Sequence, residues 1–213
     1  MMGLKKAALA TVDAPAEEDR RDSERDLNSL INDLSNSCVN VRRWAARDLT
    51  NNLAARPAIL DQIDKETNPN VIEALFSAIQ GMCDEGIVQA LINKLKSEDA
   101  QVRNGAIEIF QSQPDLFAAH VKELLLDDDP DTRIFAADII GVIRHPDARL
   151  WLHDLAMYDD NINVVGTAID KLAEVGDAST LPVLNKVSQR FGDAPYIAFA
   201  INCVRQNIGD TNE

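Results

Sequence analysis

The sequence predicts an all-α protein, an α-solenoid of about six stacked helix pairs. Three observations support this prediction. Apolar residues make up 46% of the 213 residues and aromatic residues only 5%, which is typical of a helical, aliphatic core. Apolar residues recur at helical spacing along most of the chain. One helical pattern also returns every 30 to 32 residues, and a fixed period in this range indicates a repeat architecture.

Two regions are predicted, a flexible N-terminal tail at residues 1–23 and a repeat domain at residues 24–213. The tail mixes alanine, proline and charged residues without a persistent apolar stripe, which favours disorder. Residues 1–56 hold nine Lys/Arg and nine Asp/Glu, whereas residues 57–213 hold twelve and twenty-six, so the later part carries the whole net charge of −14. A chain this acidic is expected to repel nucleic acid and anionic membranes.

Each repeat is expected to hold a first helix, a turn and a second helix. The stretch 128–141 shows the unit, because Asp129-Pro130-Asp131 forms a turn with a capping carboxylate and the small Ala136 then allows a close neighbour. The expected first helices are residues 27–34, 57–65, 86–95, 116–126, 148–157 and 181–189. The second helices begin their shared pattern at Val41, Val71, Val102, Thr132, Val164 and Tyr196. Since a single pair is too small to bury its apolar face, stacking of neighbours is required.

The repeated pattern resembles a known family. Val102-Arg103 followed by Ala106, and the matching Val41-Arg42, resemble HEAT repeats and more narrowly the short HEAT-like repeats named after phycobilin lyases. The resemblance covers about residues 27–208. It implies that the second helices line a concave face.

The resemblance also implies an arginine ladder between repeats. Arginine follows the leading residue of three second helices, at Arg42, Arg103 and Arg133. The other three second helices have an aliphatic residue there, so we expect an incomplete ladder. Residues 191–195 are expected to belong to a capping repeat.

Within each second helix, positions three, four and seven are expected to face the groove. Glu108, Asp138 and Asp170 then form an acidic stripe, and Trp44, Phe135 and Phe199 form a neighbouring aromatic column. One interpretation is a groove that holds a basic segment and anchors side chains on aromatic rings. The other is a solvated face beside aromatic residues that complete the core. The candidate partner-binding residues are Arg43, Trp44, Arg47, Glu73, Glu108, Ile134, Phe135, Asp138, Asp170 and Phe199.

No motif in the sequence indicates catalysis, a metal or a cofactor. The three histidines lack the spacing of a metal-binding helix, and the aspartates at 127–129 lack the glycine and glutamate of a calcium loop. Three widely spaced cysteines favour reduced thiols and a cytoplasmic location. No apolar run approaches the length of a membrane span.

These observations favour a non-enzymatic scaffold or adaptor that binds a protein or peptide partner through an acidic concave groove. The partner is expected to present a basic surface. Arg42, Arg43, Arg47 and Arg56 form a basic end, which leaves self-association open beside simple local pairing. The resemblance leaves a second function open, a bilin lyase or lyase subunit acting on phycobiliproteins. A HEAT-like DNA glycosylase would need a basic groove, which the net charge disfavours.

Overall fold

The computed structural model describes residues 25–210. The tail predicted at residues 1–23 lies outside the described residues and stays a prediction. The described part of the chain is helical, with α-helices joined by turns and a few 3₁₀ segments. Its α-helices are α1 (Leu27–Asp33), α2 (Val39–Asp48), α3 (Arg56–Ile63), α4 (Pro69–Ile79), α5 (Val88–Leu95), α6 (Ala100–Ser112), α7 (Pro114–Leu125), α8 (Pro130–Val142), α9 (Ala148–Tyr158), α10 (Ile162–Val175), α11 (Leu181–Phe191) and α12 (Pro195–Asp210).

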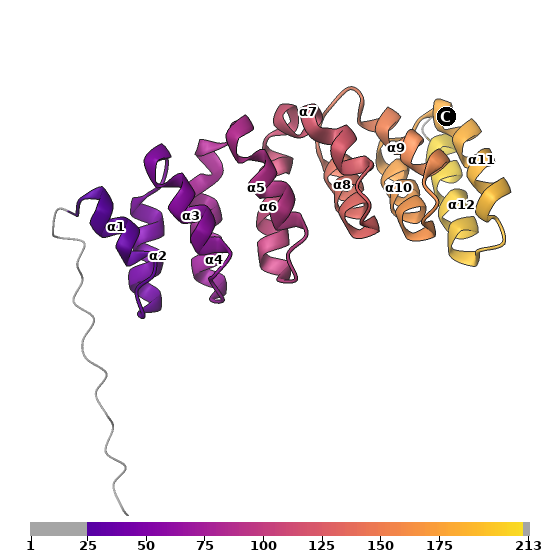
Figure 1. Cartoon of the computed structure of the whole chain (residues 1–213). Helices are drawn as coiled ribbons and strands as arrows, with labels where there is room; N and C mark the ends of the chain where they lie inside the picture. The colour runs from indigo at the N-terminus through magenta and orange to yellow at the C-terminus, as the bar shows by residue number, and fades with distance from the viewer. Residues whose placement is uncertain (1–24, 211–213) are drawn as a thin grey trace, which may run out of the picture.

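The helices stand in one elongated row of pairs, from the indigo end to the yellow end of Figure 1. Each second helix packs on the second helix of the next pair, in the order α2, α4, α6, α8, α10 and α12. Packing is most extensive where α10 meets α8 and α9. The α-solenoid of six helix pairs is therefore confirmed.

Repeated caps fix the start of most second helices. Asn68, Asp99, Asp129 and Asn161 each accept a hydrogen bond from the backbone N–H two residues on, at 2.8 to 3.1 Å. Such a cap contributes about 1 kcal/mol to a helix. Pro69 and Pro130 occupy the first turns of α4 and α8, where no backbone donor is needed. The second helices accordingly begin before the leading apolar residue of the pattern.

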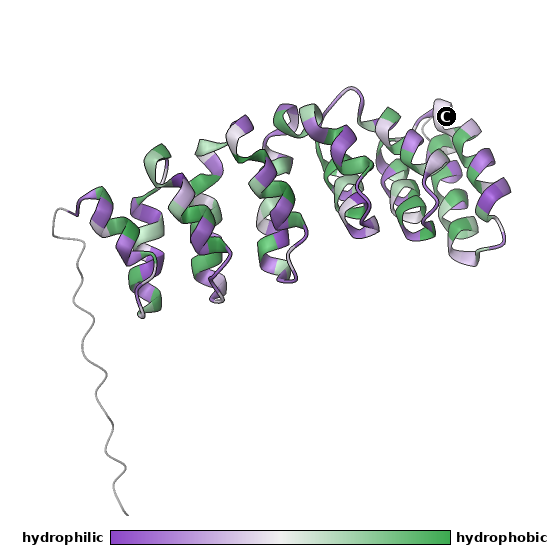
Figure 2. Cartoon of the chain, in the orientation of Figure 1, coloured by the Kyte–Doolittle hydropathy of each residue, from purple (hydrophilic) through white to green (hydrophobic). Residues whose placement is uncertain are grey.

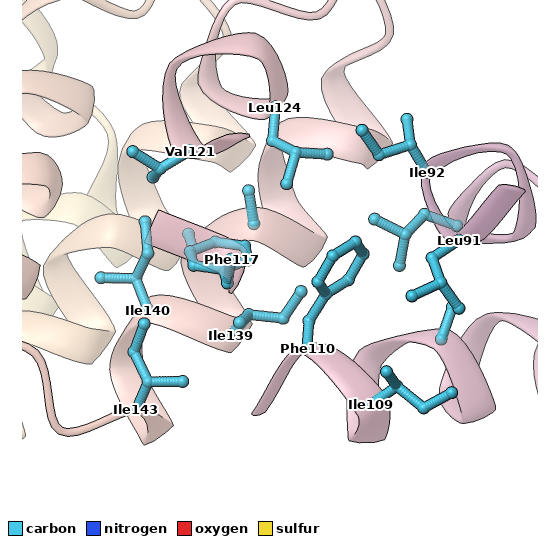
Figure 3. Close-up of a cluster of buried hydrophobic side chains, with 14 of the residues drawn as sticks. Leu91, Ile92, Ile109, Phe110, Phe117, Val121, Leu124, Ile139, Ile140 and Ile143 are labelled. Atoms are coloured by element: carbon cyan, nitrogen blue, oxygen red, sulfur yellow. The ribbon is translucent and has the colours of Figure 1, made fainter. Parts of the chain in front are cut away.

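The core runs the length of the row and takes buried apolar side chains from every α-helix of the described residues. Figure 2 shows hydrophobic and hydrophilic residues mixed along these helices. Figure 3 shows the middle of this core, with Phe110 of α6 next to Phe117 of α7. Their rings meet edge to face with centroids 5.8 Å apart, and both side chains are fully buried. Ile139 of α8 lies beside them, so neighbouring repeats share one core. This shared burial explains why a single helix pair could not be stable alone.

Two of the three expected ladder arginines form inter-repeat ion pairs. Arg42 contacts Glu66 of the next repeat through two hydrogen bonds of 2.7 and 2.8 Å. Arg133 contacts Asp159 in the same way, at 2.7 and 3.1 Å. Arg103 instead donates to the two backbone carbonyls of residues 97 and 98. The ladder is therefore incomplete in a further repeat beyond the three that lack the arginine.

Other ion pairs bridge the remaining junctions and add a second pair between repeats four and five. In each pair the cation and the carboxylate come from neighbouring repeats, and the cation comes from the earlier repeat at some junctions and the later one at others. They are Arg56–Asp84, Lys94–Asp64, Lys96–Asp127, Lys171–Asp138, Arg149–Asp177 and Arg190–Asp160. Every junction between consecutive repeats is therefore bridged by at least one ion pair.

Candidate functional site

The predicted site residues all lie on second helices, and we call the surface that they share the second-helix face. The structure exposes five of them: Arg47, Glu73, Glu108, Asp170 and Phe199. It half-buries the other five: Arg43, Trp44, Ile134, Phe135 and Asp138. The ten residues are therefore not equally available to a partner.

A hollow of about 240 Å³ lies between α4 and α6 on the second-helix face. Glu73 of α4 and Glu108 of α6 both line it, so the structure brings two predicted site residues together. The nearly buried side chains of Ile72 and Phe76 also line it and supply apolar surface. Its remaining lining residues are Pro69, Asn70, Gln101, Asn104 and Gly105. We call this hollow the α4–α6 hollow.

Gly105 permits this hollow. It occupies the helix position at which other repeats carry Trp44, Phe135 and Phe199. A Cβ atom at Gly105 would lie only 2.3 Å from the ring of Phe76, far inside a normal contact. The glycine therefore lets Phe76 pack directly on the α6 backbone, and no side chain from α6 position four covers the ring. This role depends on where the Phe76 ring lies and is not visible in the repeat pattern.

The acidic stripe is not uniform. Asp138 forms an ion pair of 2.9 Å with Lys171 of the following repeat, whose aliphatic stem passes close to Gly141. Asp170 is exposed; partial burial raises the pKa of its carboxyl, and the neighbouring Lys171 opposes that rise. Glu73 and Glu108 form no ion pair within residues 25–210. The uncompensated negative charge of this face therefore includes the two carboxylates at the α4–α6 hollow.

The aromatic column divides between core and surface. Phe135 packs against the core, and the guanidinium of Arg103 lies 5.6 Å from its ring centroid, a cation–π contact. Ile134 packs against the same core. Phe199 is 71% exposed on α12. The interpretation that aromatic residues complete the core thus suits Phe135, whereas Phe199 offers an open apolar surface.

The basic end is partly neutralised. Arg42 is paired with Glu66, and Arg56 is paired with Asp84 at 2.8 Å. Arg47 remains exposed, and the half-buried Arg43 has an Nε without a hydrogen-bond partner among the described residues. Two of the four arginines of the predicted basic end therefore form ion pairs between neighbouring repeats.

A larger pocket of about 530 Å³ lies at the edge of the array, where the turns after α7 and α9 come together. Its lining residues are Leu125, Leu126, Asp127, Asp128, Arg133, Asp154, Leu155, Tyr158, Asp159 and Asp160. We call it the loop-edge pocket. Sequence reasoning missed it, although a signal exists: Leu126 and Tyr158, 32 residues apart, are each followed by at least two aspartates.

The described residues contain no cluster of three His, Cys, Asp or Glu side chains able to hold a metal ion. His145 stacks on Trp151, and the ring of the buried His153 contacts the Thr180 hydroxyl at 3.0 Å. Burial lowers the pKa of His153, and the nearby Arg149 lowers it further. None of the helices between residues 25 and 210 combines the length and apolarity required to cross a membrane.

Comparison with known proteins gives the family. A family model described as HEAT repeats matches residues 118–193. Protein YibA of Escherichia coli strain K12 is 31% identical over 196 residues, and the match covers 84% of this chain and 66% of YibA. The chain is a HEAT-like repeat protein. Protein YibA of Escherichia coli O157:H7 gives the same values. This HEAT-like chain thus spans 66% of the length of these curated relatives.

Two solved structures were also compared. The X-ray structure of Escherichia coli YibA aligns with a TM-score of 0.40 at 24% identity, over 84% of this chain and 67% of that chain. The crystal structure of an engineered protein aligns with a TM-score of 0.41 at 18% identity, over 88% of this chain and 98% of that chain. HEAT repeats generally mediate protein interactions, because a row of helix pairs presents an extended binding surface.

Proposed function

We propose that this HEAT-like protein is a non-enzymatic scaffold or adaptor that binds a basic segment of a partner protein along its second-helix face. The observation that carries the proposal is the α4–α6 hollow with Glu73 and Glu108 beside it. We further propose a cytoplasmic location, supported by the wide spacing of Cys38, Cys83 and Cys203 in the sequence. The tail at residues 1–23 is proposed to be a separate region from the repeat domain.

The hollow can accommodate both the aliphatic stem and the cationic head of a lysine or arginine side chain. The long aliphatic stem of such a side chain can lie over Ile72 and Phe76, which supply apolar surface. Its cationic head can then reach the exposed carboxylates of Glu73 and Glu108. Because neither carboxylate is paired within the described chain, no internal ion pair has to break. The protein's negative charge also speeds the approach of a basic partner.

Exposed ion pairs contribute only about 0–1 kcal/mol each, so the charges supply selectivity more than affinity. The hollow must therefore be one anchor among several contacts. Phe199 and Trp44, at opposite ends of the second-helix face, offer further aromatic contacts. The proposed mode of binding is an extended segment that crosses successive second helices.

A phage-displayed peptide library, selected on the full chain, tests this proposal. Selected peptides are expected to be rich in lysine and arginine, and fluorescence anisotropy gives their affinity. The double variant Glu73→Gln with Glu108→Gln is expected to weaken binding about three- to tenfold, and the loss is expected to shrink at high salt. The matched control is Glu98→Gln with Asp193→Asn, which removes two exposed carboxylates elsewhere. Equal affinity of the wild type and the first double variant for every selected peptide would refute the proposed site.

A further inference from the structure

We propose that the loop-edge pocket is a second docking site, separate from the second-helix face. Its occupant is a partner segment in which an apolar side chain stands next to a lysine or arginine. The inference does not depend on the proposed function, since the pocket lies between repeats four and five at the turns, and shares no lining residue with the α4–α6 hollow.

The pocket has an apolar wall that its surroundings leave open to solvent. Leu126 is 81% exposed and Tyr158 is 65% exposed, whereas Leu155 beside them is nearly buried. Folded proteins expose large apolar side chains singly, but two together at the rim of a pocket indicate a contact surface. The volume of about 530 Å³ lies in the range of pockets that bind ligands.

The repeats themselves do not require apolar residues at these two positions. Leu126 and Tyr158 both stand three residues before the N-cap of the following second helix, Asp129 and Asn161. The residues three before the N-caps of α2, α4 and α6 are Ser35, Lys65 and Lys96. Stacking therefore tolerates a polar side chain at this position. The apolar pair of repeats four and five consequently needs an explanation other than the fold.

The charges of the pocket are divided between its floor and its rim. On the floor, Asp127 is paired with Lys96 at 2.6 Å and Asp159 with Arg133 at 2.7 Å. On the rim, Asp128 and Asp154 are exposed and have no ion pair within the described residues. A cationic side chain of a partner could therefore form ion pairs with Asp128 and Asp154 at the rim, whereas an anionic side chain would be repelled.

Other groups at the pocket already have charged partners. Arg190 contacts Asp160 at 3.3 Å, and the ammonium of Lys186 lies 4.1 Å from the centroid of the Tyr158 ring. This asymmetry sets the orientation of the occupant. Its apolar side chain lies against Leu126 and the Tyr158 ring, while its cationic side chain turns toward Asp128 and Asp154.

The pocket is also formed in advance. Arg133 holds the carbonyl oxygens of residues 127 and 128 at 2.7 and 3.3 Å, in addition to its two bonds to Asp159. One guanidinium thereby fixes the turn of repeat four to the turn of repeat five. A preformed pocket loses little conformational entropy on binding, which favours recognition of a short segment.

An array of nine-residue peptides tests the proposal on the full chain. The central pair combines Leu, Phe or Ser with Lys, Arg, Gln or Glu, and binding is measured by fluorescence anisotropy. Pairs of an apolar and a cationic residue are expected to bind at least tenfold more tightly than pairs that lack either. Leu126→Ser and Asp154→Lys are each expected to reduce this binding at least tenfold. The matched controls Leu53→Ser, at a 62% exposed leucine, and Asp193→Lys are expected to leave it unchanged.

Further arms of the experiment identify the occupant and separate the two proposals. Glu73→Gln with Glu108→Gln is expected to leave peptide binding at this pocket unchanged, so failure of one site does not imply failure of the other. If Leu126→Ser and Asp154→Lys both left the affinity for the array peptides unchanged, the proposed docking site would be refuted. A peptide of residues 2–12, which places Leu4 beside Lys5, is expected to bind no better than the array average. Tight binding of that peptide, displaced by the array probes, would overturn the choice of an external partner.

Discussion

Glu66 is expected to stabilise the first two repeats in a strongly pH-dependent way. Its carboxylate is nearly buried and accepts hydrogen bonds from Nε and Nη2 of Arg42 and from the side-chain amide of Gln62. It also accepts hydrogen bonds from the backbone N–H groups of residues 67 and 68. Burial by itself raises the pKa of Glu66, but these hydrogen bonds outweigh burial and lower the pKa from 4.5 to about 2. The ionised form is therefore strongly favoured in the folded state.

The magnitude follows from this pKa. A fall of about 2.5 units corresponds to about 3 kcal/mol of folding free energy at pH 7, at about 1.4 kcal/mol per unit. Because the folded pKa lies below the unfolded one, this contribution is present above pH 4.5 and declines as the pH falls toward 2. About 1.4 kcal/mol of it is lost by pH 3.5. A glutamine at position 66 mimics the protonated carboxyl and removes the dependence.

Urea unfolding of Glu66→Gln and the wild type measures the effect. Trp44 of α2 reports the first repeats, and both proteins carry Trp151→Phe so that Trp44 is the only tryptophan. The variant is expected to be less stable by about 3 kcal/mol at pH 7 and by about 2 kcal/mol at pH 3.5. Glu98→Gln serves as the exposed control. A difference between Glu66→Gln and wild type that stays constant from pH 7 to pH 3.5 would refute the reasoning.

Two further predictions concern packing and the ladder. Gly105→Ala is expected to lower the free energy of unfolding by about 1–3 kcal/mol, because the new methyl group would overlap the Phe76 ring. Gly209→Ala is expected to raise it by about 0.5–1 kcal/mol, because the new methyl group meets open space and alanine has the higher helix propensity. Thermal unfolding monitored by circular dichroism compares them; a gain in both would contradict the close contact. Arg133→Met is expected to cost about 3–5 kcal/mol by leaving a nearly buried carboxylate unpaired. Arg103→Met is expected to cost clearly less, because Arg103 pairs with no carboxylate among residues 25–210. Urea midpoints measure this, and equal losses would argue against the ladder as described.

The fold could be predicted because the same residue pattern recurs in each repeat. Period, capping residues and small helix residues agree across copies, so errors in one repeat are corrected by its neighbours. The first helix expected at residues 86–95 is an example of a feature that the sequence did not predict. In the structure α5 begins at Val88, after a 3₁₀ turn at Glu85–Ile87. That turn is set by Asp84, whose carboxylate accepts from the backbone of residue 86 and pairs with Arg56 of the preceding repeat. Such contacts between repeats are not visible in the pattern of one repeat.

The candidate site could be predicted only in part, for the same reason. Helical spacing correctly placed Glu73 and Glu108 on an exposed face, because exposure follows from the period. It could not show that Asp138 is paired with Lys171, since that contact joins two helices 33 residues apart in sequence. Nor could it show that Gly105 opens a hollow, because the space depends on where the neighbouring Phe76 ring lies.

The ion pairs at the repeat junctions are expected to respond unequally to dissolved salt. The Arg42–Glu66 and Arg133–Asp159 pairs are largely shielded from solvent, with side-chain exposures of 14% and 2%, and of 15% and 6%. Most other junction pairs have at least one partner in open contact with water, where dissolved ions weaken the attraction. The junctions between repeats one and two and between repeats four and five are therefore expected to keep a shielded arginine pair as ionic strength rises, whereas the ion pairs of the other junctions weaken.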